Sequence, residues 1–186
     1  TNSLIDLVVF GRAAALRCGA MLEAGAKQPH QPAAATEKAL TRLDRLRFAT
    51  GRASTTDLRR RMQRAMQENC AVFRTGETLK VGVEKITEVW RRSRDIGLAD
   101  RSLAWNTELI ERLEHDNLIA QAAVTVTSAA NREESRGAHA REDFPRRRDD
   151  VWMKHTLIWA DSETCATRIG YRPVRLGPFP PAEIVR

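Results

Sequence analysis

The sequence predicts a mainly α-helical protein, an antiparallel helical bundle followed by a small β-containing C-terminal piece. Between residues 36 and 131, apolar side chains recur three and four positions apart, which is the spacing of amphipathic helices. After Asn131 this periodicity stops, and an irregular charged segment leads into two stretches rich in β-branched and aromatic residues. Helices joined by short connections pack as antiparallel neighbours, so a bundle is expected. With 186 residues, the chain has room for one compact domain or two small ones.

The first helix is expected to begin near Ser3 and to end near Ala24. Ser3 and Asp6 have capping-box spacing, and the stretch from Leu4 to Leu22 contains only three charged residues. Such a helix is expected to be buried on most of its circumference. Its first turn could also direct backbone N–H groups and the positive end of the helix dipole at an anion or an electron-rich ring. An ordinary capped core helix explains the same residues, and the pattern alone favours that simpler interpretation.

A linker is expected over residues 25–35, which combine glycine and two prolines with small and polar residues. Thr36 is then expected to cap a helix that ends near residue 47. Ser54, with Asp57 three positions later, has the spacing that opens the next helix.

Three further helices complete the expected bundle. The first begins after Ser54. A break at Thr75–Glu77 precedes the second, which should stop near Gly97, and the third is a long helix from about Ser102 to Ala130. Their apolar positions are Leu58, Met62, Ala65, Met66, Cys70 and Phe73; Leu79, Val83, Ile86 and Trp90; and Leu109, Leu113, Ala120 and Val124.

The C-terminal piece is expected to contain a β-hairpin. Residues 132–150 hold six arginines and six acidic residues and read as an irregular segment that can form salt bridges. Residues 151–160 and 164–174 have the composition of strands, and residues 161–163 between them are turn-like. The proline-rich tail, residues 177–181, is expected to be extended.

The formal net charge of +7 comes largely from one segment, because residues 42–64 hold eight arginines against Asp44 and Asp57. This excess raises an alternative function, a basic helical module that binds nucleic acid or an acidic protein partner. Phe48 is the only aromatic residue among these arginines, and no nucleic-acid-binding motif occurs. A solvated or partner-facing helix surface is therefore the favoured interpretation.

Cysteine and histidine spacing excludes several kinds of site. Cys18, Cys70 and Cys165 lie far apart with no C-x-x-C pair, which favours free thiols in a reducing compartment. His139 and His155 lack the ligand spacing of a zinc site, so no metal is expected. No apolar run is long enough to span a membrane, and no secretory signal is visible.

The segment 134–143, Glu-Ser-Arg-Gly-Ala-His-Ala-Arg-Glu-Asp, is the densest group of reactive side chains. It could form a proton-transfer site around His139. Its charged groups could instead hold a loop against the bundle through charge-assisted hydrogen bonds. Networks of arginines and carboxylates are commonly structural, so the second interpretation is favoured.

Six segments follow one another in a recognisable order: residues 2–12, 62–74, 117–122, 134–143, 152–157 and 171–174. Together they resemble the flavoproteins of succinate dehydrogenase and fumarate reductase, and the succinate dehydrogenase branch fits best. Asn2-Ser3-Leu4, with the residues up to Arg12, looks like the last FAD-contacting segment of that family. L-Aspartate oxidase, a relative with a similar Ser-Arg-Gly motif, is the alternative, and residues 152–157 argue against it.

The resemblance implies a flavoprotein subunit that oxidises succinate to fumarate with FAD and passes electrons to an iron–sulfur subunit and quinone. It implies that Ser3 and Leu4 contact FAD and that this chain holds no catalytic residue. It also implies a structural motif made of Glu134, Ser135, Arg136, Gly137, His139 and Arg141. The family's glycine-rich dinucleotide motif, flavin-linked histidine and substrate-binding residues have no counterpart here. A C-terminal part of a larger flavoprotein, unable to bind FAD alone, is therefore expected.

The resemblance further implies four parts: residues 1–24, the terminal helix of the FAD-binding domain; 25–35, a linker; 36–131, a helical bundle domain; and 132–186, a C-terminal loop and β-hairpin region. The expected partners are the FAD-binding and capping domains of the same protein, the iron–sulfur subunit and, indirectly, the membrane-anchor subunits; no nucleic acid is expected. The expected location is peripheral, on the cytoplasmic face of the bacterial inner membrane or the mitochondrial matrix side. Alone, the chain is expected either to associate with a second copy through its first helix or to let that helix detach from the bundle through the linker.

Overall fold

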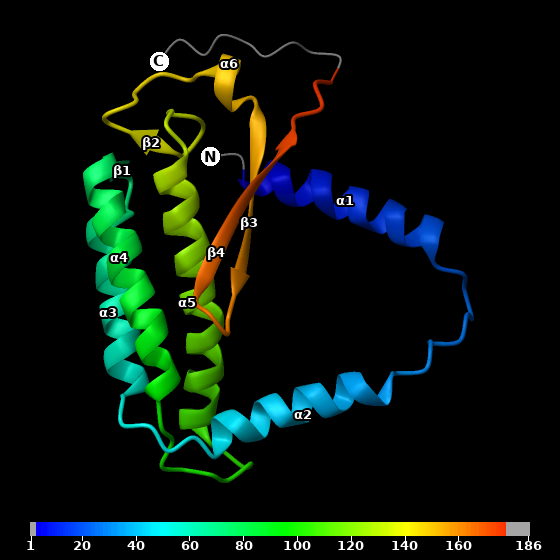
Figure 1. Cartoon of the computed structure of the whole chain (residues 1–186). Coiled ribbons are helices and arrows are strands. Elements are labelled where there is room, and N and C mark those ends of the chain that lie inside the picture. The colour runs from blue at the N-terminus through cyan, green and yellow to red at the C-terminus, as the bar shows by residue number, and fades with distance from the viewer. Residues whose placement is uncertain (1–2, 178–186) are drawn as a thin grey trace. The chain divides into compact units, whose positions relative to one another are not determined.

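The structure, a computed structural model, describes the backbone of residues 3–177 and the side chains of residues 4–177. Helices dominate it and two small two-stranded sheets accompany them, so the expected mainly α fold with a β-containing C-terminal piece is confirmed (Figure 1). The elements are α1 (Ser3–Met21), α2 (Ala33–Arg47), α3 (Thr55–Asn69), β1 (Phe73–Arg74), α4 (Gly76–Arg92), the 3-10 turn η1 (Ser93–Asp95), α5 (Thr107–Asn131), β2 (Ala140–Arg141), α6 (Asp149–Trp152), β3 (Lys154–Asp161) and β4 (Ala166–Pro173).

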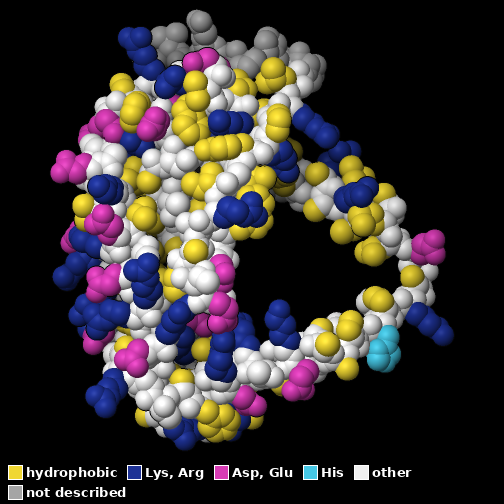
Figure 2. All heavy atoms as spheres, viewed as in Figure 1, with side chains coloured by type: hydrophobic (Ala, Val, Ile, Leu, Met, Phe, Trp, Pro, Cys, Tyr) yellow, Lys and Arg dark blue, Asp and Glu magenta, His cyan; other side chains and the backbone are white. Residues whose placement is uncertain are grey.

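The chain divides into two compact units, residues 1–41 and residues 42–186, and the boundary falls inside α2. In the first unit, α1 presents its apolar side chains to solvent. Each of Leu4, Ile5, Leu7, Val8, Val9 and Phe10 is more than half exposed. Hydrophobic side chains along α1 are visible in the space-filling view (Figure 2). Within the first unit nothing covers these side chains, so the expectation that this helix is buried is wrong for that unit taken by itself.

The two helices of the first unit differ from expectation at their ends. α1 stops about one turn earlier than expected, and Gly25 adopts a φ of +78° in the turn beyond it. α2 begins at Ala33 rather than after Thr36. The carbonyl of Pro32 accepts a hydrogen bond from the Ala35 N–H at 2.9 Å, and an alanine run with high helix propensity continues the turn. Thr36 therefore lies within the helix and does not cap it.

The second unit is built around α3, α4 and α5, which lie side by side (Figure 1). Ser54 caps α3 as the sequence predicts, since its Oγ accepts a hydrogen bond from the Asp57 N–H at 3.3 Å. Thr75 caps α4 in a reciprocal capping box. α5 begins five residues later than expected, at Thr107, because the Asn106 side chain accepts a hydrogen bond from the third N–H of the helix at 2.8 Å.

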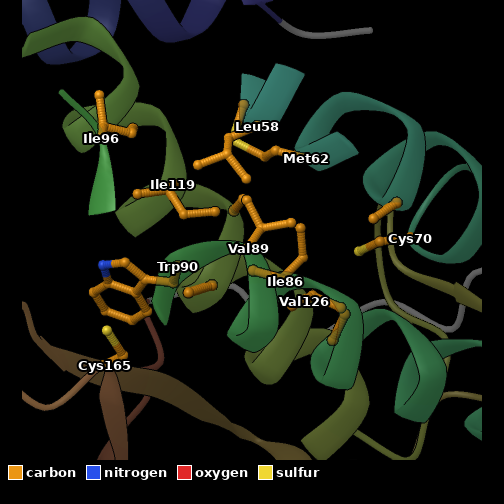
Figure 3. Close-up of a cluster of buried hydrophobic side chains, with 14 of the residues drawn as sticks. Leu58, Met62, Cys70, Ile86, Val89, Trp90, Ile96, Ile119, Val126 and Cys165 are labelled. Carbon is orange, nitrogen blue, oxygen red and sulfur yellow. The ribbon is translucent and has the colours of Figure 1, made fainter. Parts of the chain in front are cut away.

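The expected apolar stripes contribute most of one core (Figure 3). Their buried members are Leu58, Met62, Ala65, Cys70, Leu79, Ile86, Trp90 and Leu109, joined by Ile119 and Val126. Three expected members are wrong: Ala120 and Val124 are half-buried and lie outside this cluster, and Phe73 lies beyond the end of α3, on β1, and is 73% exposed. The helical periodicity stops at Asn69, so Phe73 no longer follows the face of the stripe.

Two loops cross at the end of the bundle where α4 stops. Gly51 and Gly97 face each other there, and a Cβ on Gly97 would lie 2.1 Å from the Gly51 carbonyl oxygen. The backbone N–H of Ala53 donates to the Asp95 carbonyl at 2.8 Å, and that of Leu98 donates to the Ala49 carbonyl at 3.2 Å. Glycine is required at both positions because a side chain on either loop would clash with the backbone of the other loop.

β3 and β4 form the expected antiparallel hairpin, with Lys154 opposite Pro173 and Asp161 opposite Ala166. The first strand is shorter than expected because residues 149–152 form the short helix α6. Cys165, in the turn, adopts a φ of +55° and is buried. Figure 3 shows it close to Trp90, so the tip of the hairpin joins the bundle core.

The parallel pair of β1 and β2 was not foreseen. Phe73 pairs with Ala140 and Arg74 with Arg141, so the short segment after α3 lies beside the segment after α5. Among the described residues, no helix is long and apolar enough to cross a membrane. Of the tail expected to be extended, residues 178–181 lie outside the described residues.

Candidate functional site

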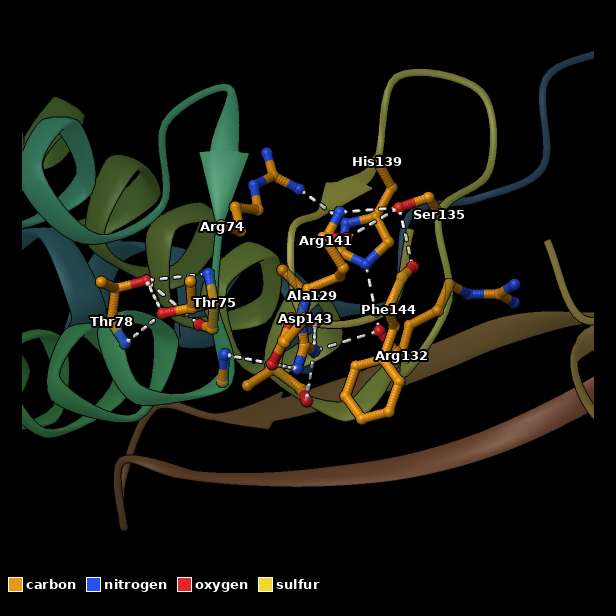
Figure 4. A network of polar contacts seen from close by, with 12 residues as sticks. Arg74, Thr75, Thr78, Ala129, Arg132, Ser135, His139, Arg141, Asp143 and Phe144 are labelled. Carbon is orange, nitrogen blue, oxygen red and sulfur yellow. Dashed lines mark hydrogen bonds and ion pairs between the residues drawn. The ribbon is translucent and has the colours of Figure 1, made fainter. Parts of the chain in front are cut away.

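The predicted motif residues lie in a polar network at the end of the bundle where α5 stops and α4 starts. Figure 4 shows Ser135, His139 and Arg141 of this network. The segment after α5 reverses direction at Gly137, which adopts a φ of +57°. On either side of this turn, Arg136 and His139 exchange two backbone hydrogen bonds, at 2.9 and 3.0 Å. The turn brings the flanking arginines back against the bundle, and glycine permits its left-handed backbone.

Arg141 is the central residue of the network and is 3% exposed. Its Nε and Nη2 donate to the two carboxylate oxygens of Asp143, at 2.7 and 2.8 Å. Its Nη1 donates to the carbonyl oxygens of Ala129, Ala130 and Arg132, at 3.4, 3.3 and 3.2 Å. The guanidinium therefore satisfies carbonyl groups that the end of α5 leaves without helical partners.

Asp143 performs the complementary task at the start of α4. Its Oδ2 accepts a hydrogen bond from the Gly76 N–H at 2.7 Å. The hydrogen bonds from Arg141, opposed by burial and helped by the Gly76 N–H, lower the pKa of Asp143 to about 2. The carboxylate is therefore ionised at neutral pH and remains paired with both the arginine and the helix end.

Ser135 fixes the loop between these charges. Its Oγ accepts a hydrogen bond from the Arg141 N–H at 2.8 Å and lies 2.9 Å from the Phe144 carbonyl oxygen, to which it can donate. The hydroxyl is buried, so this partnering removes the cost of leaving a polar group without hydrogen bonds.

Glu134 is fully buried and holds the second half of the network. Its carboxylate accepts hydrogen bonds from Arg136 Nε at 2.8 Å, from Arg136 Nη2 at 3.0 Å and from the Arg148 N–H at 2.9 Å, and it also pairs with Arg132. Arg136 in turn reaches Asp149 at 2.5 Å. Burial by itself would raise the pKa of Glu134, but the bonds from Arg136 and Arg148 outweigh it and hold the pKa below its usual value.

His139 is held between two arginines in its neutral form. Arg74 Nη1 donates to its Nδ1 at 2.8 Å, so Nε2 carries the proton and donates to the Arg132 carbonyl oxygen at 3.1 Å. Burial lowers the pKa of His139; its bond to the Arg132 carbonyl opposes this, and the positive charges of Arg74 and Arg141 lower the pKa further. Both ring nitrogens are thus occupied by protein partners.

The geometry of the network suits a structural role, and we call the network the clasp. It consists of Arg74, Arg132, Glu134, Ser135, Arg136, His139, Arg141, Asp143, Arg148 and Asp149. Its carboxylates and guanidinium groups bind one another, two helix ends and backbone carbonyls. Among residues 4–177, no group of three or more His, Cys, Asp or Glu side chains is arranged to hold a metal ion. His155, the other histidine considered, lies exposed on β3.

Three arginines of the network were missed from the sequence: Arg74, Arg132 and Arg148. Arg74 lies 65 positions from His139, and only the unforeseen β1–β2 pair brings them together. Arg132 and Arg148 flank the motif, but nothing in their spacing shows that both meet Glu134.

The two residues expected to contact FAD belong to the first unit, whereas the clasp belongs to the second. Leu4, in the first turn of α1, is 78% exposed. The side chain of Ser3 lies outside what the structure describes. Their expected role therefore stays a prediction.

Half of the eight arginines in residues 42–64 pair with acidic groups. The pairs are Arg42 with Asp116 at 3.8 Å, Arg45 with Glu163 at 3.3 Å, Arg47 with Asp44 at 3.6 Å and Arg59 with Glu114 at 3.1 Å. The local excess of positive charge is thus smaller in the fold than in the sequence, which weakens the case for a nucleic-acid surface.

Comparison with known families and proteins gives a consistent result. The family model of the fumarate reductase flavoprotein C-terminus matches residues 59–185. The succinate dehydrogenase flavoprotein subunit of Rickettsia bellii is 50% identical over 95% of this chain. The mitochondrial succinate dehydrogenase [ubiquinone] flavoprotein subunit of Oryza sativa subsp. japonica is 49% identical over 94% of it.

The fold has solved counterparts as well. A quinol-fumarate reductase structure with menaquinol molecules superposes with a TM-score of 0.83 and 33% sequence identity over 97% of this chain. The match covers 29% and 28% of the two curated relatives and 32% of the solved chain. The present chain therefore corresponds to less than a third of the proteins it resembles.

Proposed function

The chain belongs to the family of fumarate reductase flavoprotein C-terminal regions, and from this membership we propose that it is part of a succinate dehydrogenase flavoprotein subunit. The whole subunit would oxidise succinate to fumarate with FAD and pass the electrons to an iron–sulfur subunit and quinone. The succinate dehydrogenase branch is preferred because relatives with that name reach 50% identity, whereas the fumarate reductase flavoprotein subunit of Mycobacterium tuberculosis is 35% identical.

Within that enzyme, the described unit from Arg42 onward acts as a scaffold. The observation that carries this role is the clasp itself. Arg141 and Asp143 tie the end of α5 to the start of α4, and Glu134 gathers three arginine contacts around the following loop. These groups are saturated by one another, which suits a rigid support better than an acid–base centre that must release and take up protons.

The first turn of α1 is the part of this chain proposed to touch the cofactor. A helix N-terminus carries partial positive charge and free N–H groups, which would stabilise negative charge on the reduced flavin ring. Ser3 and Leu4 are the proposed contacts. When bound, FAD supplies the redox chemistry, while the protein binds and orients it. The exposed apolar side chains of α1 agree with a helix that a further domain covers.

The division into four parts is retained as a proposal: 1–24, terminal helix of the FAD-binding domain; 25–35, linker; 36–131, bundle; 132–186, C-terminal region. The proposed partners are the FAD-binding and capping domains, the iron–sulfur subunit and, indirectly, membrane-anchor subunits. The proposed location is peripheral, on the cytoplasmic face of a bacterial inner membrane or the mitochondrial matrix side.

The test uses the full-length protein that carries this chain. Adding succinate should bleach the absorbance of its bound flavin and drive reduction of an artificial dye acceptor. Adding L-aspartate under the same conditions is the matched control. Reduction by L-aspartate and not by succinate would support the L-aspartate oxidase alternative, and an absence of bound flavin would refute the assignment.

A further inference from the structure

A cavity of about 630 Å³ lies within the second unit, far along the bundle from the clasp. Its walls come from the end of α2, the end of α4 with η1, the middle of α5 and the turn of the β3–β4 hairpin. Leu46, Trp90 and Ile96 provide apolar wall surface, and all three are buried. The cavity therefore belongs to the second unit alone and is not a gap between the two units of the chain.

The lining of this cavity is strongly basic. It contains four arginines, Arg42, Arg45, Arg94 and Arg112, against two carboxylates, Asp116 and Glu163, which leaves a formal charge of +2. Net positive charge gathered in a cavity attracts anions more strongly than the same charge on an open surface.

The arginines of the lining differ in how many of their N–H groups have hydrogen-bond acceptors in the protein. Arg112 is 6% exposed, pairs with Asp116 and donates to the Ser93 carbonyl oxygen at 3.1 Å. Its buried Nε has no hydrogen-bond acceptor among the described residues. Arg94 has no hydrogen-bond acceptor among residues 4–177 either, although its charge helps to lower the pKa of Asp161. Because the Arg112 Nε is closed to solvent, the exposed guanidinium of Arg94 is the donor group of this wall that a bound anion would satisfy.

Glu163 shows where such an anion would sit. Its carboxylate, on the hairpin turn, contacts Arg45 Nη1 at 3.3 Å, and both side chains are more than 60% exposed. An exposed pair of this kind contributes little stability, so an anion with more negative charge can displace it. Asp116 is less exposed and holds Arg112 and Arg42, so it remains in place and orients them.

We propose that this cavity binds a small polyvalent oxyanion, either a diphosphate or a dicarboxylate. The ligand would lie between Arg45 and Arg94, with Arg112 in the cavity wall. Guanidinium groups bind both kinds of oxyanion through paired N–H donors, so the shared chemistry is two anionic groups joined by a short bridge. The ligand replaces the carboxylate of Glu163 at the mouth of the cavity. The site shares no residue with the clasp or with the flavin contact proposed for α1.

The test measures ligand affinity and melting temperature of the full-length protein with pyrophosphate and with malonate, at ionic strength held constant with chloride. Arg45→Gln and Arg94→Gln are each expected to weaken binding about tenfold, the loss of one charge-assisted hydrogen bond. Glu163→Gln should tighten binding, because it removes the competing carboxylate. Arg91→Gln, at an exposed arginine near the end of α4, three positions before Arg94 and outside the cavity lining, is the matched control and should leave affinity unchanged.

The two probes separate the sources of the anion. Binding of pyrophosphate that Arg94→Gln weakens identifies a phosphate ligand, and binding of malonate that Arg94→Gln weakens identifies a dicarboxylate. The comparison with Arg94→Gln is needed because the succinate site proposed for the whole subunit also takes a dicarboxylate. Binding that is equally strong in Arg94→Gln and Arg91→Gln, or an absence of binding by both probes in the parent protein, would overturn the proposal. The opposite signs expected for Glu163→Gln and Arg45→Gln guard against a general loss of stability being read as a loss of binding.

Discussion

The guanidinium of Arg141 and the carboxylate of Asp143 form a two-point ion pair that joins opposite ends of two neighbouring helices. The arginine contacts the last carbonyl groups of α5, and the aspartate contacts the first N–H of α4. The C-terminal end of a helix carries partial negative charge and the N-terminal end partial positive charge, so each member of the pair meets the helix end of opposite sign. The pair thereby supplies both helices with hydrogen-bond partners that the chain turns at those ends do not provide.

We predict that Asp143→Asn lowers the free energy of unfolding by about 1–3 kcal/mol, because it weakens the bond to the nearly buried Arg141 and to the start of α4. Urea unfolding at pH 7 would measure the change. Asp150→Asn is the control, since Asp150 forms only an exposed pair with Arg148 at 3.5 Å. Equal, small effects of both substitutions would show that the clasp contributes no more than a surface ion pair.

Arg136→Ala should test whether the motif supports the fold or takes part in turnover. The substitution removes two hydrogen bonds from the fully buried Glu134 and one from Asp149. We expect a loss of about 2–4 kcal/mol of stability in the full-length protein, because a buried charge loses part of its compensation. A lower melting temperature with turnover retained per folded molecule is the expected result. Lost turnover at an unchanged melting temperature would assign the motif to catalysis.

The sequence predicts the bundle well because burial follows helical periodicity there. Leu58, Ile86 and Trp90 belong to predicted stripes, and all lie in the core. The prediction fails for α1, where composition indicated burial and the first unit by itself offers no cover. The apolar composition of a helix indicates that its side chains favour burial. It does not indicate which chain segment covers them.

The clasp could be predicted only in part. The high density of charged residues in the sequence identifies the motif. Its structural role can be predicted because networks of arginines and carboxylates are commonly structural. Which groups pair does not follow from the sequence. Arg74 reaches His139 through a two-residue parallel strand pair, and periodicity arguments cannot detect strands that short.

Acid should destabilise the bundle through His115 before the carboxylates of the clasp are protonated. His115 is fully buried, its Nε2 lies 2.7 Å from Ser93 Oγ, and burial, with the nearby Arg112 charge, lowers its pKa to about 4. The unfolded chain binds a proton near pH 6.5, so between pH 6.5 and pH 4 the folded state binds fewer protons than the unfolded state. Stability is therefore complete above pH 6.5 and falls by up to about 3 kcal/mol as the pH drops through this window.

Replacing the histidine tests that assignment. His115→Gln removes the titrating group, so the dependence of unfolding free energy on pH between 6.5 and 4 should become shallower, whatever the substitution costs at pH 7. The lowered pKa of His139 acts in the same direction, and His139→Gln is the parallel measurement. An unchanged slope in His115→Gln would mean that this histidine is already protonated in the fold.

The crossing of Gly51 and Gly97 should not tolerate a side chain. In Gly97→Ala the new Cβ would lie 2.1 Å from one backbone atom of Gly51 and 2.8 Å from another, so the two loops must separate. We expect a loss of more than about 2 kcal/mol in a thermal or urea unfolding experiment. Gly19→Ala, in α1, is the control, because a Cβ added at Gly19 would have no atom within 4 Å and alanine favours the helix. Comparable losses of unfolding free energy in both variants would contradict the predicted clash between the two loops.

The isolated 186-residue chain should self-associate through α1. Each of its exposed apolar side chains forgoes roughly 1.5–3 kcal/mol of burial, and pairing two copies of the helix recovers part of it. Sedimentation at several protein concentrations would show a dimer that Val8→Glu, in the middle of the apolar stretch, returns to monomer. Arg12→Glu, a polar change on the same helix, should leave the dimer in place. A monomer at all concentrations would contradict the prediction.

The same isolated chain should not bind FAD. On the proposed assignment its only cofactor contacts are Ser3 and Leu4 in one helix turn, and no G-x-G-x-x-G phosphate-binding motif occurs in the sequence. One helix end offers few N–H groups for a cofactor as large as FAD, and association must first overcome the loss of rotational and translational freedom. Titration followed by flavin fluorescence should therefore show no saturable quenching at micromolar concentrations, while the full-length protein retains flavin. Saturable binding by the isolated chain, abolished by Leu4→Asp, would place the essential cofactor contacts inside these residues and would overturn the assignment of FAD binding to a further domain.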